Sequence, residues 1–144
     1  MIKFDTSEID KFVIDLKDTS ENIRSDVQKV LKKSGFNIEA RAKRNITNNG
    51  SVKTGHLRRG VTTDIGNMEV TVHTSNIKYA RGVEEGTRPH TIRAKNKKAL
   101  YWKGAKHPVK SVRHPGSRAK PFLIPAFEKE KEVIMKDLEK IVKW

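Results

Sequence analysis

Apolar residues in the first third of the chain recur at steps of three and four positions, the spacing of one face of an α-helix. Ser7 with Asp10 three residues later is typical of a helix start, and the Asn-Asn-Gly-Ser run at 48–51 ends the pattern with turn residues. Residues 7–47 are therefore predicted to be helical, with Gly35 as a point where the helix is kinked or divided. The apolar stripe is formed by Ile9, Phe12, Val13, Leu16, Ile23, Val27, Val30, Leu31, Ile38, Ala42 and Ile46.

From Leu57 the apolar period changes to two, as in strands with one buried face. The alternation continues on both sides of Gly66-Asn67, a pair that favours a tight hairpin turn. Residues 57–83 are predicted to form a β-hairpin followed by a third strand from Ile77 to Val83. The span 88–120 is expected to be rich in loops, with short candidate strands at 91–93, 99–103 and 109–113.

A last helix is predicted at residues 122–142. Pro121 and Pro125 lie near its start, where the missing backbone N–H costs little. Its apolar face is formed by Leu123, Phe127, Ile134, Leu138, Ile141 and Val142. The chain, residues 1–144, is thus expected to be one α+β domain. An antiparallel β-sheet would be flanked by a long N-terminal helix and a C-terminal helix, with a long, basic, loop-rich insertion.

The net charge of +14 is concentrated in the middle of the chain. Residues 1–26 hold four basic and seven acidic side chains, whereas residues 27–120 hold 22 basic and five acidic ones. Between Glu85 and Glu128 there is no acidic residue, although this stretch carries eleven lysines and arginines and three histidines. Like charges held together repel one another, so this segment is expected to meet an acidic partner, either a protein or a nucleic acid.

Several classes of protein are excluded by the composition. The chain has no cysteine, which rules out disulfides and cysteine-built zinc sites. No signal peptide or membrane-spanning apolar run is visible, so a cytoplasm-like compartment and no membrane partner are expected.

The candidates for catalysis are weak. His107 and His114 are seven residues apart in loops without a nearby carboxylate, which argues against a metal site. Together with His90 they could instead serve a small basic ribonuclease, in which cations hold the phosphate and a histidine moves the proton. Glu84 and Glu85 would point to opposite faces of a strand, so they form no catalytic pair, and one of them is expected to face the basic segment or a neighbouring subunit.

Three phrases resemble the signatures of a tailed-bacteriophage family. They read VKTGHLRR at residues 52–59, YARGVEEGT at 79–87 and HPGSRAKPFLIPA at 114–126. The family contains the tail-component or neck proteins of long-tailed phages, also called tail-completion or head–tail joining proteins. In the first phrase Val52 replaces the usual proline, and Gly60 stands where the family has a serine.

The resemblance implies a small structural α+β subunit without catalytic residues or cofactor. Such subunits form a ring, hexameric by analogy, at the head-proximal end of the tail. The expected partners are other copies of the chain and other phage neck and tail proteins, with transient contact to DNA in the lumen. The expected location is the tail or neck of the virion, and the host cytoplasm during assembly. The alternative is a small basic nucleic-acid-binding protein or a toxin-like ribonuclease.

Two sets of residues are therefore candidates for contacts, and residues 94–118 are expected to become ordered only on assembly. The set expected at a subunit or assembly interface is Glu84, Glu85, Arg88, Tyr101, Trp102, Lys106, His107, Lys110, Arg113, His114, Arg118 and Lys120. The set expected to make weak contact with DNA is Arg58, Arg59, Arg93, Lys95, Lys97 and Lys98.

Overall fold

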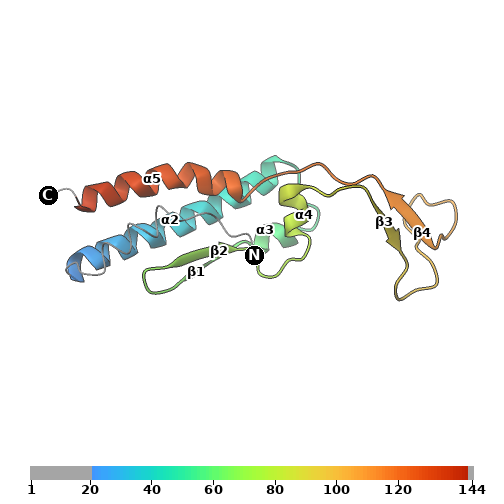
Figure 1. The fold of residues 1–144 in the computed structure, drawn as a ribbon, viewed down its shortest axis with the longest axis horizontal. Helices are drawn as coiled ribbons and strands as arrows, with labels where there is room; N and C mark the ends of the chain where they lie inside the picture. Colours follow the sequence, from blue (N-terminus) through green and yellow to red (C-terminus); the bar gives the residue numbers. More distant parts are fainter. Residues whose placement is uncertain (1–20, 143–144) are drawn as a thin grey trace.

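The computed structural model describes residues 21–142, which form a helical body and a long projecting arm (Figure 1). We define the arm as residues 86–117 and the body as the other described residues. The fold class is α+β, as predicted. In chain order the elements are α2 (Glu21–Asn48), α3 (His56–Gly60), β1 (Thr62–Ile65), β2 (Val70–His73), α4 (Ala80–Glu85), β3 (His90–Arg93), β4 (Ser111–His114) and α5 (Ile124–Val142).

The long helix α2 runs without interruption for 28 residues, so the prediction of a kink or division at Gly35 is wrong. Gly35 instead allows a close approach between α2 and the β1–β2 hairpin. A Cβ at this position would lie 2.3 Å from Cγ1 of Val70 and 2.9 Å from Cγ2 of Thr63. The predicted first part of the helix, residues 7–20, lies outside the described residues.

Helices α2 and α5 lie side by side along the body (Figure 1). Their apolar faces contribute to two core clusters. The first surrounds Phe122 and Leu123 at the end of the body next to the arm, and the second surrounds Val27, Ile134 and Leu138 towards the opposite end. The 19-residue α5 is the predicted C-terminal helix, and it begins at Ile124 instead of residue 122.

Strands β1 and β2 form the predicted antiparallel hairpin, with pairs from Thr62↔His73 to Ile65↔Val70. The predicted tight turn at Gly66-Asn67 is displaced by one residue: the Gly66 N–H donates to the Glu69 carbonyl at 2.8 Å, which leaves residues 67 and 68 at the tip of the loop. The side chain of Gln28 in α2 holds this loop: its Nε2 donates to the Gly66 carbonyl at 2.9 Å, and its Oε1 accepts from the Met68 N–H at 2.8 Å. Met68 consequently has a φ of 58° and packs against the second core cluster instead of continuing a strand.

The predicted third strand, Ile77 to Val83, is not formed. Instead, residues 80–85 form the short helix α4, because Ile77, Ala80 and Glu84 are buried at helical spacing. Leu57, where the strand pattern was expected to begin, is a core residue of α3. The strands of residues 21–142 therefore form two separate two-stranded sheets, β1–β2 and β3–β4, and not one larger sheet.

The second sheet lies within the arm, where short strands were predicted. The candidates at 91–93 and 109–113 correspond to β3 and β4, although β4 begins at Ser111. The candidate at 99–103 is reduced to a single bridge between Leu100 and Val109. No helix within residues 21–142 has the length and the apolar content needed to cross a bilayer.

Candidate assembly interface on the arm

The arm is a two-stranded ribbon that leaves the body after α4 and returns before α5 (Figure 1). Its strands pair antiparallel from His90↔His114 to Arg93↔Ser111. At the base, Thr87 and Ser117 exchange two backbone hydrogen bonds of 2.9 and 3.0 Å, and their hydroxyl groups lie 2.9 Å apart. The ribbon is therefore closed where it meets the body.

Two glycines allow this close pairing at the base. Gly86 and Gly116 have φ values of 76° and 90°, which favour glycine over any residue with a side chain. A Cβ on Gly116 would lie 2.3 Å from the Thr87 carbonyl oxygen, and a Cβ on Gly86 would lie 2.7 Å from the Ser117 carbonyl oxygen. Both contacts are with backbone atoms, which cannot move aside as a flexible side chain could.

Glu84 ties the base of the arm to the first turn of α5. The residue is 2% exposed, and its carboxylate accepts hydrogen bonds from three backbone N–H groups, those of Phe122 at 2.8 Å, Leu123 at 3.0 Å and Ile124 at 2.9 Å. These donors have no partner within the helix, and the partial positive charge of the helix N-terminus also favours a carboxylate there. Glu84 therefore joins the chain entering the arm to the chain leaving it.

One of Glu84 and Glu85 was expected to face the basic segment or a neighbour, and both were in the predicted interface set; this position does not suit Glu84 for that role. Its carboxylate is buried and its oxygens are bonded within its own chain, so it offers no exposed charge. The adjacent Glu85 does lie at the surface, where its Oε2 accepts from Nε of Arg81 at 2.9 Å. The sequence could not reveal the role of Glu84, because its partners are 38 to 40 residues away.

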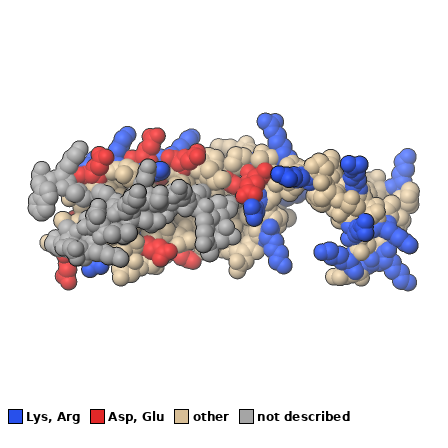
Figure 2. Space-filling model, in the orientation of Figure 1, with Lys and Arg blue, Asp and Glu red and all other residues tan. Residues whose placement is uncertain are grey.

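The arm is uniformly positive. It contains nine lysines and arginines and no acidic residue, whereas every carboxylate side chain of residues 21–142 belongs to the body (Figure 2). No arm lysine or arginine forms an ion pair with a carboxylate of the described residues; the ion pairs found there join residues of the body. The nine arm cations are Arg88, Arg93, Lys95, Lys97, Lys98, Lys103, Lys106, Lys110 and Arg113.

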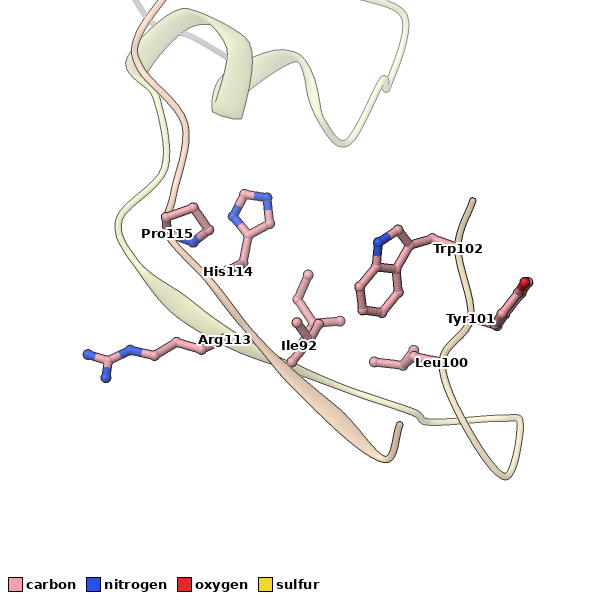
Figure 3. A pocket seen from close by; sticks show the side chains of 8 residues that line it. Ile92, Leu100, Tyr101, Trp102, Arg113, His114 and Pro115 are labelled. Atoms are coloured by element: carbon pink, nitrogen blue, oxygen red, sulfur yellow. The ribbon is translucent and has the colours of Figure 1, made fainter. Parts of the chain in front are cut away.

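One side of the arm carries an apolar groove of about 470 Å³, shown in Figure 3. Ile92 of β3, Leu100 and Trp102 point towards one another across it, while Tyr101 points away. The exposed fractions are 37% for Ile92, 47% for Trp102 and 70% for Tyr101. The complete lining is Ile92, Leu100, Tyr101, Trp102, Val112, Arg113, His114 and Pro115.

Two of the three arm histidines lie together at the junction between groove and base. The rings of His90 and His114 stack with their centroids 5.1 Å apart. Nδ1 of His90 lies 2.8 Å from the Arg88 carbonyl oxygen, and Nδ1 of His114 accepts from the Gly116 N–H at 3.0 Å. His107 belongs to the loop before β4. Residues 21–142 contain no group of three or more histidine, aspartate and glutamate side chains that could hold a metal ion.

The two predicted sets of contact residues are distributed differently. Most of the predicted interface set lies on the arm, with Arg118 and Lys120 just beyond its base. The predicted DNA set is divided: Arg58 and Arg59 belong to α3 in the body, whereas Arg93, Lys95, Lys97 and Lys98 belong to the arm (Figure 1). Sequence reasoning did not find the groove, because it identified Tyr101 and Trp102 without the facing side chains of Ile92 and Val112.

The chain folds as a compact helical body with a projecting arm, none of whose residues is buried. The family model described as "Bacteriophage HK97-gp10, putative tail-component" matches residues 10–86, more than half of the chain. The chain therefore belongs to this HK97-gp10-like family of tailed-phage tail components, a structural family associated with the virion. Comparisons with curated proteins and with solved structures found no match.

The matched range includes the phrases at 52–59 and 79–87 and ends at Gly86, where the arm begins. In the structure these two phrases form α3 and α4 with their flanking turns. The third phrase, at 114–126, lies beyond the match and contains the returning base of the arm and the first turn of α5. The assignment to the family thus rests on residues that precede the arm, and almost all of the arm lies outside the match.

Proposed function

We propose that the protein is a tail-completion or neck component that assembles into a closed ring at the head–tail junction of a tailed phage. The support comes from its family together with the arm, none of whose residues is buried in the isolated chain. A ribbon of two strands alone is at best marginally stable in water. An arm of this kind gains most when a second molecule covers its apolar groove and neutralises its charge.

A ring requires an interface in which two different surfaces meet head to tail. The arm carries lysines and arginines without any carboxylate, whereas the body mixes both signs, so the two surfaces differ (Figure 2). We therefore propose that the arm of one subunit contacts the body of the next subunit or ring. The predicted interface residues remain in this proposal except for Glu84, whose carboxylate is used within the chain.

The proposed role is structural and not enzymatic, in line with the family. The stacked pair His90 and His114 is the arrangement that most favours the alternative, a small ribonuclease. The Nδ1 atom of each imidazole, however, already lies against a backbone group at the base of the arm. We expect no RNA cleavage by the purified protein; cleavage that disappears in the His114→Ala variant would contradict the structural role.

Contact with DNA is a secondary part of the proposal. The arm cations Arg93, Lys95, Lys97 and Lys98 could touch phosphates in the lumen, with Arg58 and Arg59 of α3 as a separate patch. Because DNA has to pass through the ring, we expect weak binding that falls steeply with added salt. An electrophoretic shift that persists at high salt would favour the nucleic-acid-binding alternative.

The ring itself is tested by static light scattering together with negative-stain electron microscopy. We expect a mass several times the 16.4 kDa of one chain and closed rings, hexameric by analogy with the family. A second sample carries Lys106→Glu, Lys110→Glu and Arg113→Glu, which should weaken assembly without unfolding the body. A protein that stays monomeric over the whole concentration range, or a charge-reversed variant that assembles normally, would contradict the proposal.

A further inference from the structure

The groove on the arm requires an apolar occupant. Ile92, Leu100, Trp102 and Val112 line it, and Ile92 and Trp102 remain 37% and 47% exposed. Covering such side chains is favourable by about 25 cal/mol for each Å² of apolar surface removed from water. A phosphate backbone offers little apolar surface to cover them, so the occupant should carry apolar side chains of its own.

The surroundings of the groove also require negative charge. Arg113 lines the groove, with its guanidinium directed away from Ile92 and Trp102 (Figure 3), and eight further lysines and arginines lie on the same arm without a carboxylate partner among the described residues. Each cation that gains an acidic partner in a partly covered site adds attraction and selects against basic surfaces. The occupant should therefore be both apolar and acidic.

The chain itself contains a segment with this chemistry. Residues 8–16 read EIDKFVIDL, with three acidic residues and one lysine. The apolar residues Ile9, Phe12, Val13 and Leu16 follow the i, i+3, i+4, i+7 spacing of one face of a helix. The sequence therefore predicts an amphipathic helix with an apolar face and acidic flanks.

Distance prevents this segment from reaching the arm of its own chain. The described chain begins with Glu21 at the end of the body opposite the arm (Figure 1). The 28 residues of α2 separate that end from the base of the arm by roughly 42 Å at 1.5 Å per residue. The residues between Leu16 and Glu21 span at most about 18 Å when fully extended.

We infer that the groove on the arm of one copy takes the segment at residues 8–16 of a neighbouring copy. The contact joins opposite ends of two subunits and is therefore heterologous, as the interfaces of a ring are. This inference rests on the proposed ring and adds residues 8–16 of the neighbouring copy to the surface that the arm contacts. Trp102 is the central contact, because a large aromatic side chain becomes buried when the segment enters.

The test uses Trp102 as its own reporter. The chain has two tryptophans, so the Trp144→Phe substitution leaves Trp102 as the sole source of tryptophan emission. In this background the substitutions Phe12→Ser and Leu16→Ser disrupt the apolar face of residues 8–16 in every copy. The groove of each copy is then left without its proposed occupant. A synthetic peptide of residues 5–20 is then added while the emission of Trp102 is recorded.

We expect a saturable blue shift of Trp102 with the wild-type peptide. A peptide with serine at the four apolar positions should bind at least tenfold more weakly. A peptide with its acidic residues neutralised should bind several-fold more weakly and lose its salt dependence. In the protein, Ile92→Ser should abolish the shift, whereas Val52→Ser should preserve it, because Val52 is similarly exposed, at 42%, but lies on the body.

The inference is overturned if the wild-type peptide leaves Trp102 unchanged, or if the serine peptide shifts it equally. A shift produced by a DNA duplex and not by the peptide would also overturn it, in favour of a nucleic-acid surface. Light scattering on the unmodified protein separates this failure from that of the proposed function. If the protein forms rings but the peptide does not shift the emission of Trp102, only the proposed occupant of the groove is overturned. If the protein is a monomer and the peptide does not shift the emission, both the occupant and the proposed ring are overturned.

Discussion

The body and the arm of this protein are stabilised in different ways. In the body, Phe122, Ile46 and Leu123 are at most 1% exposed, and carboxylates such as Glu84 and Glu130 are buried with hydrogen-bond partners. In the arm no residue is buried, no lysine or arginine has a carboxylate partner among the described residues, and the shape depends on strand pairing and on two glycines. The difference shows that the fold is held mainly by the body, and it supports the proposal that the arm serves contacts with other molecules.

The largest expected difference between the two regions is the cost of removing an aromatic ring. Phe122→Ala should lower the free energy of unfolding by about 3–5 kcal/mol, because it leaves a cavity in the first core cluster. Tyr101→Ala should change it by less than about 0.5 kcal/mol, because that side chain is 70% exposed. Urea unfolding followed by circular dichroism measures both. Equal losses would show that the arm is part of the folding unit.

The next largest effect concerns the link between the arm and α5. Glu84→Gln should cost about 2–3 kcal/mol, because hydrogen bonds from three N–H groups to a buried carboxylate are replaced by a neutral amide that accepts at only one atom. Glu85→Gln is the matched control, since Glu85 is exposed and pairs only with Arg81, and should cost less than about 0.5 kcal/mol. If the two variants were equally stable, Glu84 would not be holding the helix N-terminus.

A smaller and local effect is expected at the base of the arm. Gly116→Ala places a Cβ against the Thr87 carbonyl in a left-handed conformation, a strain of about 1–3 kcal/mol. It should speed amide hydrogen exchange across the arm and leave the exchange of α2 and α5 unchanged. Gly104→Ala serves as the control, because its Cβ would meet no atom within 4 Å even though its φ is also positive. Faster exchange throughout the body would contradict the separation of the two regions.

The smallest predicted effect is a pH dependence confined to the body. Burial alone would raise the pKa of Glu39, but the hydrogen bonds from Lys43 and Thr63 outweigh it and hold the pKa below its usual 4.5. Because the folded pKa is the lower one, Glu39 stabilises the fold above about pH 4.5, and this contribution is lost as the pH falls through the folded value. The stability difference between the wild type and Glu39→Gln should therefore shrink on acidification. A difference that does not change with pH would contradict this.

The sequence predicted the elements whose apolar residues repeat over several turns or alternate beside a recognisable turn. Helices α2 and α5 and the β1–β2 hairpin are of this kind. It did not predict α4, because a six-residue helix offers too few turns to distinguish its pattern from a strand. Gly35 was misjudged because a glycine that kinks a helix and one that admits a neighbouring strand look alike in sequence.

The candidate site was only partly predictable. The acid-free charge of residues 86–127, and with it most residues of the arm, was visible in the sequence. Glu84 is excluded from the interface set, and Ile92 and Val112 are included in the groove, because of contacts between residues 20 to 40 positions apart in the chain. Such contacts are decided by tertiary packing, which local patterns do not encode.

The claim that the arm serves assembly while the body folds independently is tested most directly by removing the tip of the arm. Replacing residues 94–110 with Asn-Gly would join β3 to β4 through a short turn and delete Trp102, Tyr101 and six lysines. We predict that light scattering gives the mass of a monomer, and that the thermal unfolding midpoint stays within about 2 °C of the full-length chain. A variant that still assembles like the wild type, or whose body no longer folds, would contradict the account.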